Sequence, residues 1–559
     1  MLRSAVRPRR TLSLPAVIAI ASLWFVVACN APFWRDAIAA RGGVSLANLS
    51  FFASLFLFTL ILTNLLLTLL APRPIAKAML GFFFAVTPIL TYFMATHGVL
   101  IDGTMIRNTF ETDPGEAGEL ITPRMLGYLA LLGLPPLAWL TWIRLETRTF
   151  RAGLASLGLM FAGTFAGVGA IAALHYQDYA SFLRNHRELR YRLAPLNFVS
   201  SIFMYSKESL RTPRELRAIG TDAHQHLAPA GSRRNRLVVI VVGETARAAN
   251  FSLGGYARQT NPELASRNVV YFSDVEACST STANSLPCMF SSLGSAHFDQ
   301  STARSQENLL DVLEHAGVSV LWRENNSGCK GICDRVETEV LSHLRQPGVC
   351  SDEECFDEIL LGDLQQRIDR MQSDMVIVLH QKGSHGPGYH LRYPARFKVF
   401  TPTCETNSLE QCSAVEIANA YDNTIRYTDH ILAQTIDLLE RNAASRDTAM
   451  LYVSDHGESL GEKGVYLHGI PPFFAPDTQT HVPMIVWLSE GFARNGIVDR
   501  ARLDRSRGAR LSHDNLFHSV LGLLDIDTSV YQSQLDVFRA ARPVAATIHA
   551  SARPHEGRS

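Results

Sequence analysis

The 559-residue sequence has no excess of charge of either sign, because 52 lysine and arginine residues balance 52 aspartate and glutamate residues. No nucleic-acid partner is therefore expected, since such a partner favours a basic chain. Internal repeats and long low-complexity tracts are also missing from the sequence, so no repeat architecture is indicated. The length is too great for one compact domain and predicts at least two.

Charged side chains are missing from five apolar runs near the N-terminus, which lie at 11–34, 48–70, 78–99, 125–143 and 153–174. A membrane span needs about 20 apolar residues, so the runs predict a membrane domain with five helices over residues 1–174. Buried core helices are the alternative. The first run could also be a signal peptide, but the second follows closely and favours a retained anchor.

Basic residues near the ends of these runs predict the orientation of the spans. They precede the first run and follow the second and fourth: Arg3, Arg7, Arg9 and Arg10; Arg73 and Lys77; Arg144, Arg148 and Arg151. Short loops that carry such residues face the cytoplasm. We therefore expect a cytoplasmic N-terminus and an outward-facing segment after residue 174. Four arginines after the fifth run do not contradict this, because long translocated segments largely escape the rule.

Cysteine is almost absent from the membrane region, where Cys29 stands alone. The other eight cysteines form four close pairs along the chain: Cys278 and Cys288, Cys329 and Cys333, Cys350 and Cys355, and Cys404 and Cys412. Paired cysteines in an extracytoplasmic segment indicate disulfides, and we expect the four local bridges. Zinc binding by Cys329 and Cys333 is the alternative interpretation of that pair.

The rest of the chain divides into a connector, a globular domain and a tail. Residues 175–235 predict a connector with interfacial helices, for which a solvated linker helix is the alternative. Apolar runs at 237–242, 374–380 and 483–489, and a further run within 448–459, predict strands, and helical patterns lie between them. Alternating strands and helices predict an α/β domain over 236–545 with a mostly parallel sheet. Residues 546–559 are predicted to be a disordered tail.

Polar residues follow three of these strands. Glu244 follows the first, Asp455 and His456 follow another, and His380, His385 and His390 lie at or beyond a third. Ligands bind beyond the carboxyl ends of strands in such sheets. A Glu, an Asp and a His suit Zn²⁺ or Mn²⁺. The alternative is structural, with Asp455 capping a helix and Glu244 in a salt bridge.

The loop "CSTSTANSLPC" holds five hydroxyl side chains between Cys278 and Cys288. A Ser or Thr hydroxyl needs a base or a metal to become a nucleophile. The sulfatase pattern Cys/Ser-x-Pro-x-Arg matches at Ser285 and Pro287, but Met289 occupies the Arg position. A sulfatase centre at Ser285 is therefore disfavoured.

Residues 1–540 resemble the phosphoethanolamine transferase family of bacterial inner membranes, which modifies lipid A and related envelope glycolipids. The matching stretches include "VVGETAR", "CSTSTANSLPCMF", "NNSGCKGICDR", "GSHGPGYHLRYP", "YVSDHGESLGEKGVYLHG" and "THVPMIVWLS". The resemblance implies a phosphotransferase with five transmembrane helices before a periplasmic, alkaline-phosphatase/sulfatase-like α/β domain.

The resemblance also implies roles for individual residues. It places one tight Zn²⁺ on Glu244, Thr282, Asp455 and His456, with Thr282 as the nucleophile and Thr280 as the alternative. Ser327 and Lys330 match phosphate and substrate contacts. His385 and His468 match histidines that bind the substrate phosphate, assist proton transfer or hold a second, weaker zinc. His390 departs from the family, which usually has an aromatic residue there. The roles of His481 and Glu458 remain ambiguous.

The outer loop at 100–124 carries three further polar residues, Asn108, Thr112 and Glu116. Their spacing of i, i+4 and i+8 would place them on one face of a helix. In the family this face meets the lipid head group. An interfacial helix with a polar side is the alternative.

The resemblance finally implies a reaction. Phosphatidylethanolamine would donate phosphoethanolamine to lipid A through a phosphoethanolamine-threonine intermediate, in a membrane-embedded protein that we expect to be a monomer. The product would bind polymyxins and other cationic peptides less well. The alternatives are another envelope glycolipid as acceptor, a phosphoglycerol transferase or sulfatase-like hydrolase, and a non-catalytic lipid-binding or sensor protein with a structural metal.

Overall fold

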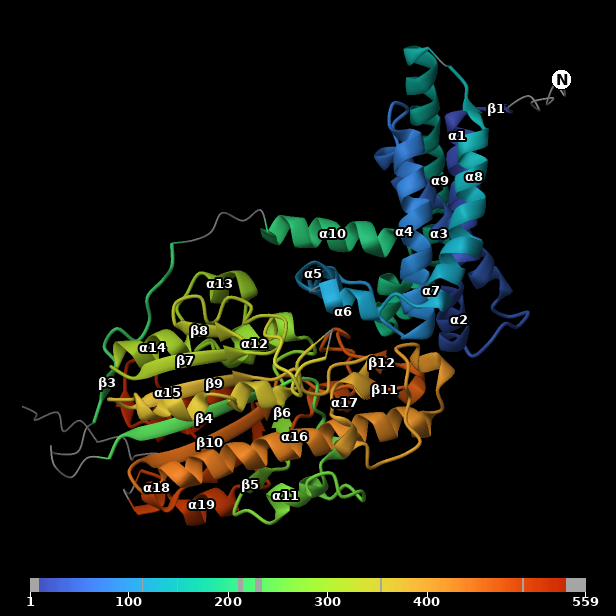
Figure 1. Cartoon of the computed structure of the whole chain (residues 1–559). Helices are drawn as coiled ribbons and strands as arrows, with labels where there is room; N and C mark the ends of the chain where they lie inside the picture. The colour runs from blue at the N-terminus through green and yellow to red at the C-terminus, as the bar shows by residue number, and fades with distance from the viewer. Residues whose placement is uncertain are drawn as a thin grey trace, which may run out of the picture.

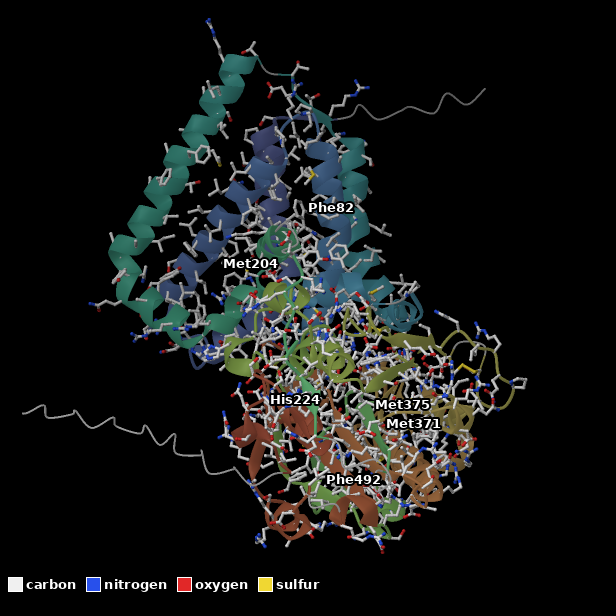
Figure 2. The ribbon with its side chains drawn as sticks, turned by 90° about the vertical axis from the view of Figure 1, so that its left-hand side faces the viewer. Phe82, Met204, His224, Met371, Met375 and Phe492 are labelled. Carbon is white, nitrogen blue, oxygen red and sulfur yellow. A yellow bond between two sulfur atoms is a disulfide. The ribbon has the colours of Figure 1, made fainter. Side chains whose placement is uncertain are left out.

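The computed structural model describes residues 10–538 except 113, 148, 210–214, 227–233, 352–353 and 495–496. The predicted tail, Arg3, Arg7, Arg9 and Arg148 lie outside the described residues. Figure 1 shows a bundle of long helices standing on an α/β domain. Figure 2 shows Phe82 within the bundle, Phe492 in the α/β domain and Met204 where the two regions meet.

Four helices in the described residues are long and apolar enough to cross a membrane. They are α3 (Leu49–Leu70), α4 (Ala76–Thr96), the continuous helix Pro123–Trp142 and α9 (Phe150–Asn185). The helix Pro123–Trp142 consists of α7 (Pro123–Tyr128), η2 (Leu129–Gly133) and α8 (Leu134–Trp142). A fifth span exists if the bent pair Leu14–Cys29 and Ala31–Ala40 counts as one. The helical part of the predicted fold class is therefore confirmed, with a first span that is bent by 62°.

The bend lies at Asn30, two residues before Pro32, which has no backbone N–H to continue the helix. It separates α1 (Leu14–Trp24) and η1 (Phe25–Cys29) from α2 (Ala31–Ala40). The Asn30 side-chain amide donates hydrogen bonds to the carbonyl oxygens of Phe25 and Ala194, at 2.9 and 2.6 Å. Its backbone is non-helical, with φ −107° and ψ 28°. A short polar side chain that bonds to nearby backbone groups competes with the helix, which explains the break.

Three helices connect the bundle to the α/β domain: α5 (Gly103–Glu111), α6 (Pro114–Glu119) and α10 (Leu196–Ser209). The rings of Phe110 in α5 and Tyr205 in α10 stack at 5.3 Å. The expected single helix through Asn108, Thr112 and Glu116 is wrong. Thr112 is extended, with φ −72° and ψ 135°, and α6 starts at Pro114, which disfavours helical backbone in the residue before it. The Glu116 side chain lies outside the described residues.

A seven-stranded sheet forms the centre of the α/β domain. Its strands, in order across the sheet, are β5 (Val270–Phe272), β13 (Met484–Leu488), β10 (Asp447–Ser454), β4 (Arg236–Gly243), β9 (Met375–His380), β7 (Ser319–Glu324) and β8 (Glu337–Val340). The pairs from β10 to β8 are parallel, as predicted, whereas β13 runs antiparallel to both of its neighbours.

Helices cover both faces of this sheet. In β4 the side chains of Val238, Ile240 and Val242 pack into one core and those of Leu237, Val239 and Val241 into the other. The first core also takes residues of α12 (Thr282–Met289), α14 (Leu309–His315) and α20 (Asp514–Leu523), and the second takes residues of α16 (Ala414–Asn442). Such burial on both faces explains why the strands are continuous apolar runs.

Short elements complete the domain. The remaining helices are α11 (Pro262–Ala265), α13 (Gln300–Arg304), α15 (Leu364–Asp369), α17 (Asp477–Thr480), α18 (Glu490–Arg494) and α19 (Arg500–Arg505). Three two-stranded pairs belong to it as well: β3 (His224–Gln225) with β15 (Ile526–Asp527), β6 (Asp274–Glu276) with β14 (Arg510–Ser512), and β11 (Ser459–Leu460) with β12 (Tyr466–Leu467). A fourth pair, β1 (Thr11–Leu12) with β2 (Arg144–Leu145), lies in the helical region. The eight cysteines of the domain form the four local disulfides. The thiolates of Cys329 and Cys333 are therefore not available to zinc.

Candidate active site

Two acidic residues, Glu244 and Asp455, follow the carboxyl ends of two neighbouring parallel strands, β4 and β10. Gly243 at the end of β4 pairs with Ser454 at the end of β10, so Glu244 and Asp455 leave the sheet side by side. His456 follows directly. All three side chains are fully buried. Parallel pairing of two strands thus collects residues that are more than 200 positions apart in the sequence.

The carboxylate oxygens of Glu244 and Asp455 and the Nε2 of His456 lie close together and can all act as electron-pair donors. The Nδ1–H of His456 donates to the carbonyl oxygen of Gly457 at 2.9 Å, so Nε2 carries a lone pair. This Nε2 lies 3.5 Å from Glu244 Oε1 and 3.3 Å from Asp455 Oδ2. Burial lowers the pKa of His456 well below its usual value, which keeps the imidazole neutral. A proton on His456 therefore cannot balance the two carboxylates.

A divalent cation would balance them. One ligand atom from each of Glu244, Asp455 and His456 lies within 4.8 Å of the others. Asp455 Oδ2 is buried and has no hydrogen-bond partner among the described residues, although buried polar atoms normally have one. Two carboxylates and one neutral imidazole are a ligand set that suits zinc. The residues present therefore fit a metal centre.

The loop between Cys278 and Cys288 brings a hydroxyl to this centre. Thr282 is the first residue of α12, and its Oγ1 lies 3.2 Å from each Glu244 carboxylate oxygen and 3.3 Å from His456 Nε2. His513 holds the loop, because its Nδ1 accepts from the backbone N–H of Cys278 and its Nε2–H donates to the Ser454 carbonyl. Thr282 is thus held beside Glu244 and His456.

Two other hydroxyls of the loop, those of Thr280 and Ser285, are bonded to backbone carbonyls elsewhere. Thr280 is buried, and its Oγ1 donates to the carbonyl oxygen of Ile470 at 2.6 Å. Ser285 is buried as well and donates to the backbone carbonyl of Asp455. Among the contacts of the described residues, neither hydroxyl is hydrogen-bonded to the side chain of Glu244 or His456, in contrast to Thr282.

A small cavity of about 30 Å³ opens beside Thr282. Its lining includes six of the residues expected to bind substrate: Asn108, Thr112, Ser327, Lys330, His385 and His468. The Lys330 ammonium donates to Ser327 Oγ at 3.1 Å and to the Ser327 carbonyl at 2.9 Å. The rings of His385 and His468 lie 5.4 Å apart, and His468 lies 4.5 Å from His456, measured between centroids. The cavity thus places a cation and two imidazoles beside the candidate metal ligands.

Two histidines considered from the sequence lie elsewhere. His390 is not among the lining residues of this cavity, and burial lowers its pKa. His481 is engaged by its Nε2 with the Ser273 carbonyl at 2.8 Å. We assign neither residue to the site.

Sequence reasoning missed two residues around the site, Asn326 and Gly383, and left Glu458 ambiguous. Asn326 donates from Nδ2 to Glu244 Oε2 at 2.6 Å. Glu458 accepts from His468 Nδ1 at 3.1 Å and from the Tyr389 hydroxyl at 2.8 Å. Gly383 has φ +56°, and a Cβ there would lie 2.7 Å from the Glu244 carbonyl oxygen. Asn326 directly precedes Ser327, and Glu458 lies two residues after His456, so adjacency to the motifs was the available signal.

Comparison with known proteins supplies the family. Residues 58–210 match the family model described as phosphoethanolamine transferase EptA/EptB, and residues 236–526 match the sulfatase family model. The phosphoethanolamine transferase EptA of Salmonella typhimurium is 41% identical over 96% of this chain and 98% of its own length. The chain belongs to the phosphoethanolamine transferase family. This membership and the α/β fold class confirm the two corresponding predictions.

Two further relatives also match nearly the whole length of this chain. The phosphatidylethanolamine transferase Mcr-1 of Escherichia coli is 36% identical over 94% of this chain and 97% of its own length. The solved structure of the integral membrane protein lipooligosaccharide phosphoethanolamine transferase A (EptA) from Neisseria meningitidis covers 95% of this chain and 99% of its own, at 36% identity and a TM-score of 0.91. The likeness therefore includes the arrangement of the helical bundle and the α/β domain.

Proposed function

We propose that this transferase moves phosphoethanolamine from phosphatidylethanolamine to a phosphate of lipid A, through a covalent intermediate on Thr282. The observation that carries the proposal is the position of Thr282 Oγ1, within 3.3 Å of the Glu244 carboxylate and of His456 Nε2. A structural metal site would not need a hydroxyl beside its ligands. This arrangement therefore supports an enzyme over a non-catalytic lipid-binding protein.

In the first step Thr282 Oγ1 attacks the phosphorus of the donor lipid. The Oγ1–P bond forms, the bond from phosphorus to the diacylglycerol oxygen breaks, and the proton of the Thr282 hydroxyl passes to solvent water. The Glu244 carboxylate accepts a hydrogen bond from the Thr282 hydroxyl. A lone pair on Thr282 Oγ1 therefore points away from Glu244. Glu244, Thr282, Asp455 and His456 would hold Zn²⁺, which supplies positive charge that lowers the pKa of the hydroxyl and stabilises the phosphoryl oxygens.

Two further groups face the phosphoryl oxygens in the cavity. Lys330 supplies an ammonium group, which its bonds to Ser327 hold beside Thr282. Thr282 also starts α12, and the first N–H groups of a helix favour a phosphate. Charge that develops on the oxygens during transfer is therefore met by a preorganised positive environment.

His468 is suited to protonate the leaving diacylglycerol oxygen. The carboxylate of Glu458 accepts from His468 Nδ1, which orients the ring and stabilises its protonated form, so that Nε2 can carry the transferred proton. In the second step an acceptor phosphate oxygen attacks the phosphorus, and Thr282 leaves and regains a proton. Inversion at each step gives net retention at phosphorus.

An apolar cavity supports a lipid donor. It measures about 320 Å³ and contacts α4 and α5 as well as the active site. Phe93, Met105 and Ile106 line it on the side of the bundle, and His385 and His468 line it at the site. A diacylglycerol phosphate needs this combination of an apolar channel and a polar end.

We propose an inner-membrane location, with the N-terminus in the cytoplasm and the α/β domain in the periplasm. Arg73 and Lys77 on one side of the spans and four disulfides in the α/β domain support this orientation. Lipid A is proposed as acceptor because related curated proteins include Kdo(2)-lipid A phosphoethanolamine 7''-transferases. Added ethanolamine masks phosphate charge, so polymyxin binding should weaken.

Intact mass measurement tests the covalent step. Zinc-loaded protein incubated with phosphatidylethanolamine should gain one phosphoethanolamine, which peptide mapping places on Thr282. The adduct should be absent in Thr282→Ala and after chelation, and present in the matched control Thr280→Ala. Phosphatidylglycerol in place of the donor should give no adduct. An adduct that persists in Thr282→Ala would refute the assigned nucleophile.

Lipid A mass spectra from cells with and without the protein test the acceptor. Phosphoethanolamine on lipid A only in cells with active protein is the expected result, together with lower polymyxin susceptibility. If another glycolipid changes while lipid A does not, the acceptor is wrong although the chemistry of Thr282 stands.

A further inference from the structure

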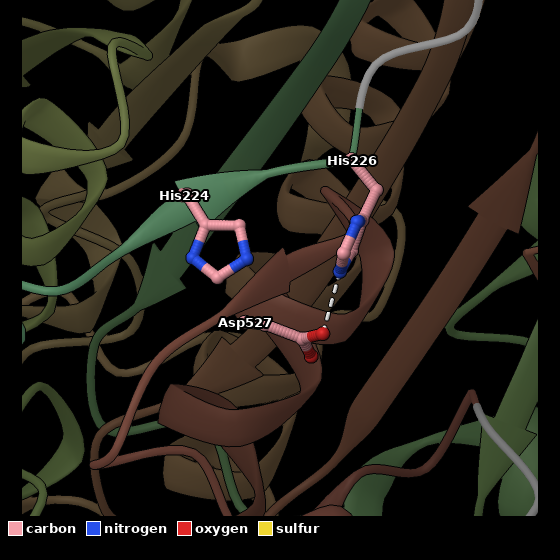
Figure 3. Close-up of side chains that lie close together, drawn as sticks. All are labelled: His224, His226 and Asp527. Carbon is pink, nitrogen blue, oxygen red and sulfur yellow. Dashed lines mark hydrogen bonds and ion pairs between the residues drawn. The ribbon is translucent and has the colours of Figure 1, made fainter.

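A second group of metal-ligand side chains lies on the two-stranded pair of β3 and β15. Asp527 of β15 pairs directly with His224 of β3 in antiparallel register. His226 is two residues beyond His224, and side chains that alternate along an extended chain return to the same face at this spacing. Figure 3 shows the two imidazoles and the carboxylate on one side of the pair. Both histidines are exposed, and Asp527 is partly exposed.

The ligand atoms of these three side chains already converge. One atom from each lies within 4.8 Å of the others. His226 Nε2 is 2.5 Å from Asp527 Oδ2, and the two imidazole centroids are 5.2 Å apart. The Nδ1 of His224 lies 3.1 Å from the carbonyl oxygen of Asp222, which can only accept, so the proton is on Nδ1. His224 Nε2 therefore has a free lone pair, the tautomer that metal-bound histidines show when Nδ1 donates to a carbonyl.

Hydrogen bonds on both strands hold this group in place. The Asp222 carboxylate accepts from the Thr528 hydroxyl and the Ser529 backbone N–H, both at 2.7 Å. The backbone N–H of His226 donates to the Asp525 carbonyl at 2.9 Å. Three ligands carried on a cross-linked strand pair need only side-chain rotations to close around an ion, which lowers the entropic cost of binding.

The group is remote from the active site. Gln225, between the two histidines, donates to Asp374 directly before β9 and to the Leu524 carbonyl, which also accepts from Arg236 at the start of β4. The strand pair therefore lies at the amino ends of the central strands, whereas Glu244 and Asp455 lie at the carboxyl ends. Eight residues of β4 separate the two ends, which is about 25 Å at the usual rise per residue.

We propose that His224, His226 and Asp527 bind a zinc ion separate from the catalytic centre. Two imidazoles and a carboxylate suit Zn²⁺, whereas Mg²⁺ and Ca²⁺ prefer oxygen ligands alone. Water completes the coordination sphere. On binding, the proton of His226 moves from Nε2 to Nδ1, and Zn²⁺ replaces the hydrogen bond to Asp527, so no proton is released. The ion links two parts of the chain: the connector before β4, which carries His224 and His226, and strand β15, which carries Asp527. It thereby fixes the connector on the α/β domain.

Zinc stoichiometry of the full-length protein in detergent tests this site. Protein stripped of metal is loaded with Zn²⁺, passed through gel filtration and analysed for zinc per chain. The double variant His224→Gln/His226→Gln should retain one zinc fewer than the wild type. The matched control, His297→Gln/His343→Gln, changes two exposed histidines elsewhere and should retain the wild-type number. Asp527→Asn should weaken the affinity for the additional zinc by at least about tenfold.

Two further measurements separate this site from the catalytic one. Zinc should slow amide hydrogen exchange in the peptide that spans 221–226 in the wild type but not in the double variant. Formation of the phosphoethanolamine adduct should be the same in both. Equal zinc retention by the double variant and its control, with no zinc effect on exchange at 221–226, would mean that these residues form only a surface ion pair and would overturn the proposal.

Discussion

Replacement of Asn326 by alanine should weaken zinc binding at the active site. The Asn326 side-chain amide donates to Glu244 Oε2 at 2.6 Å, and both side chains are buried. The same amide lies 3.3 Å from His380 Nε2, whose Nδ1 is bound to Glu324 at 2.8 Å. The bond therefore fixes the rotation of the Glu244 carboxylate, whose Oε1 lies 3.5 Å from His456 Nε2.

The size of the effect follows from this single bond. A hydrogen bond to a charged group contributes about 1.5–3 kcal/mol, and loss of a group that orients a metal ligand lowers affinity by roughly 10–100-fold. The two ranges agree, because a tenfold change corresponds to about 1.4 kcal/mol. Asn326→Ala should therefore bind zinc roughly 10–100-fold more weakly than the wild type. Its adduct formation should fall at limiting zinc and recover at excess zinc.

Asn325→Ala is the matched control. Asn325 is equally buried but donates to Asp357 and to the Cys355 carbonyl instead of Glu244. Its loss should lower stability and leave zinc affinity unchanged. Competition with a chromogenic zinc chelator measures the affinity, and intact mass measures the adduct. If both Asn326→Ala and Asn325→Ala bind zinc as tightly as the wild type, the hydrogen bond from Asn326 does not position Glu244 for zinc binding, and the prediction is refuted.

Three other substitutions test separate features. Gly383→Ala should cost roughly 1–3 kcal/mol of stability and reduce adduct formation, because the new Cβ meets the backbone of Glu244. Gly348→Ala, with φ +82° and open space around it, should cost strain alone; equal activity of the two variants would refute the steric argument. His468→Gln should slow adduct formation by about 10²–10⁴-fold while catalytic zinc remains, and an unchanged rate would exclude His468 as the acid. Burial lowers the pKa of His518 from 6.5 to about 4. His518 therefore binds a proton more tightly in the unfolded chain than in the folded protein. The contribution of His518 to the free energy of unfolding is highest above pH 6.5 and falls as the pH decreases toward 4. Denaturation midpoints should show that the wild type loses about 2 kcal/mol more than His518→Gln between pH 7 and pH 5; equal losses would contradict this.

Local patterns account for the parts of the fold that were predicted. The spans are visible because a bilayer requires an uninterrupted apolar run, and the central strands because burial on both faces leaves them uniformly apolar. The bend at Asn30 was not predicted, because the amide that stabilises it bonds to Ala194, 164 residues away. The antiparallel direction of β13 was not predicted for a similar reason, since an apolar run does not encode which way it enters a sheet.

The site divides in the same way. Glu244, Asp455 and His456 were accessible because a polar residue directly after a buried strand is a local signal. Asn326 was not, because an asparagine in a loop carries no sign of which carboxylate it contacts. The break between α5 and α6 lay within reach of the sequence, since Pro114 disfavours helical backbone before it, but the regular spacing of Asn108, Thr112 and Glu116 favoured one helix.

By itself, the sequence determined the membrane region, the α/β domain, the paired cysteines and the residue types of a metal centre. The tertiary structure alone decided what each hydroxyl between Cys278 and Cys288 contacts. Thr280 and Thr282 are equivalent in type and two residues apart, yet one donates to the Ile470 carbonyl and the other faces Glu244 and His456. The physical reason is that composition and periodicity act along the chain, whereas a hydrogen-bond partner is set by packing between segments that are distant in it.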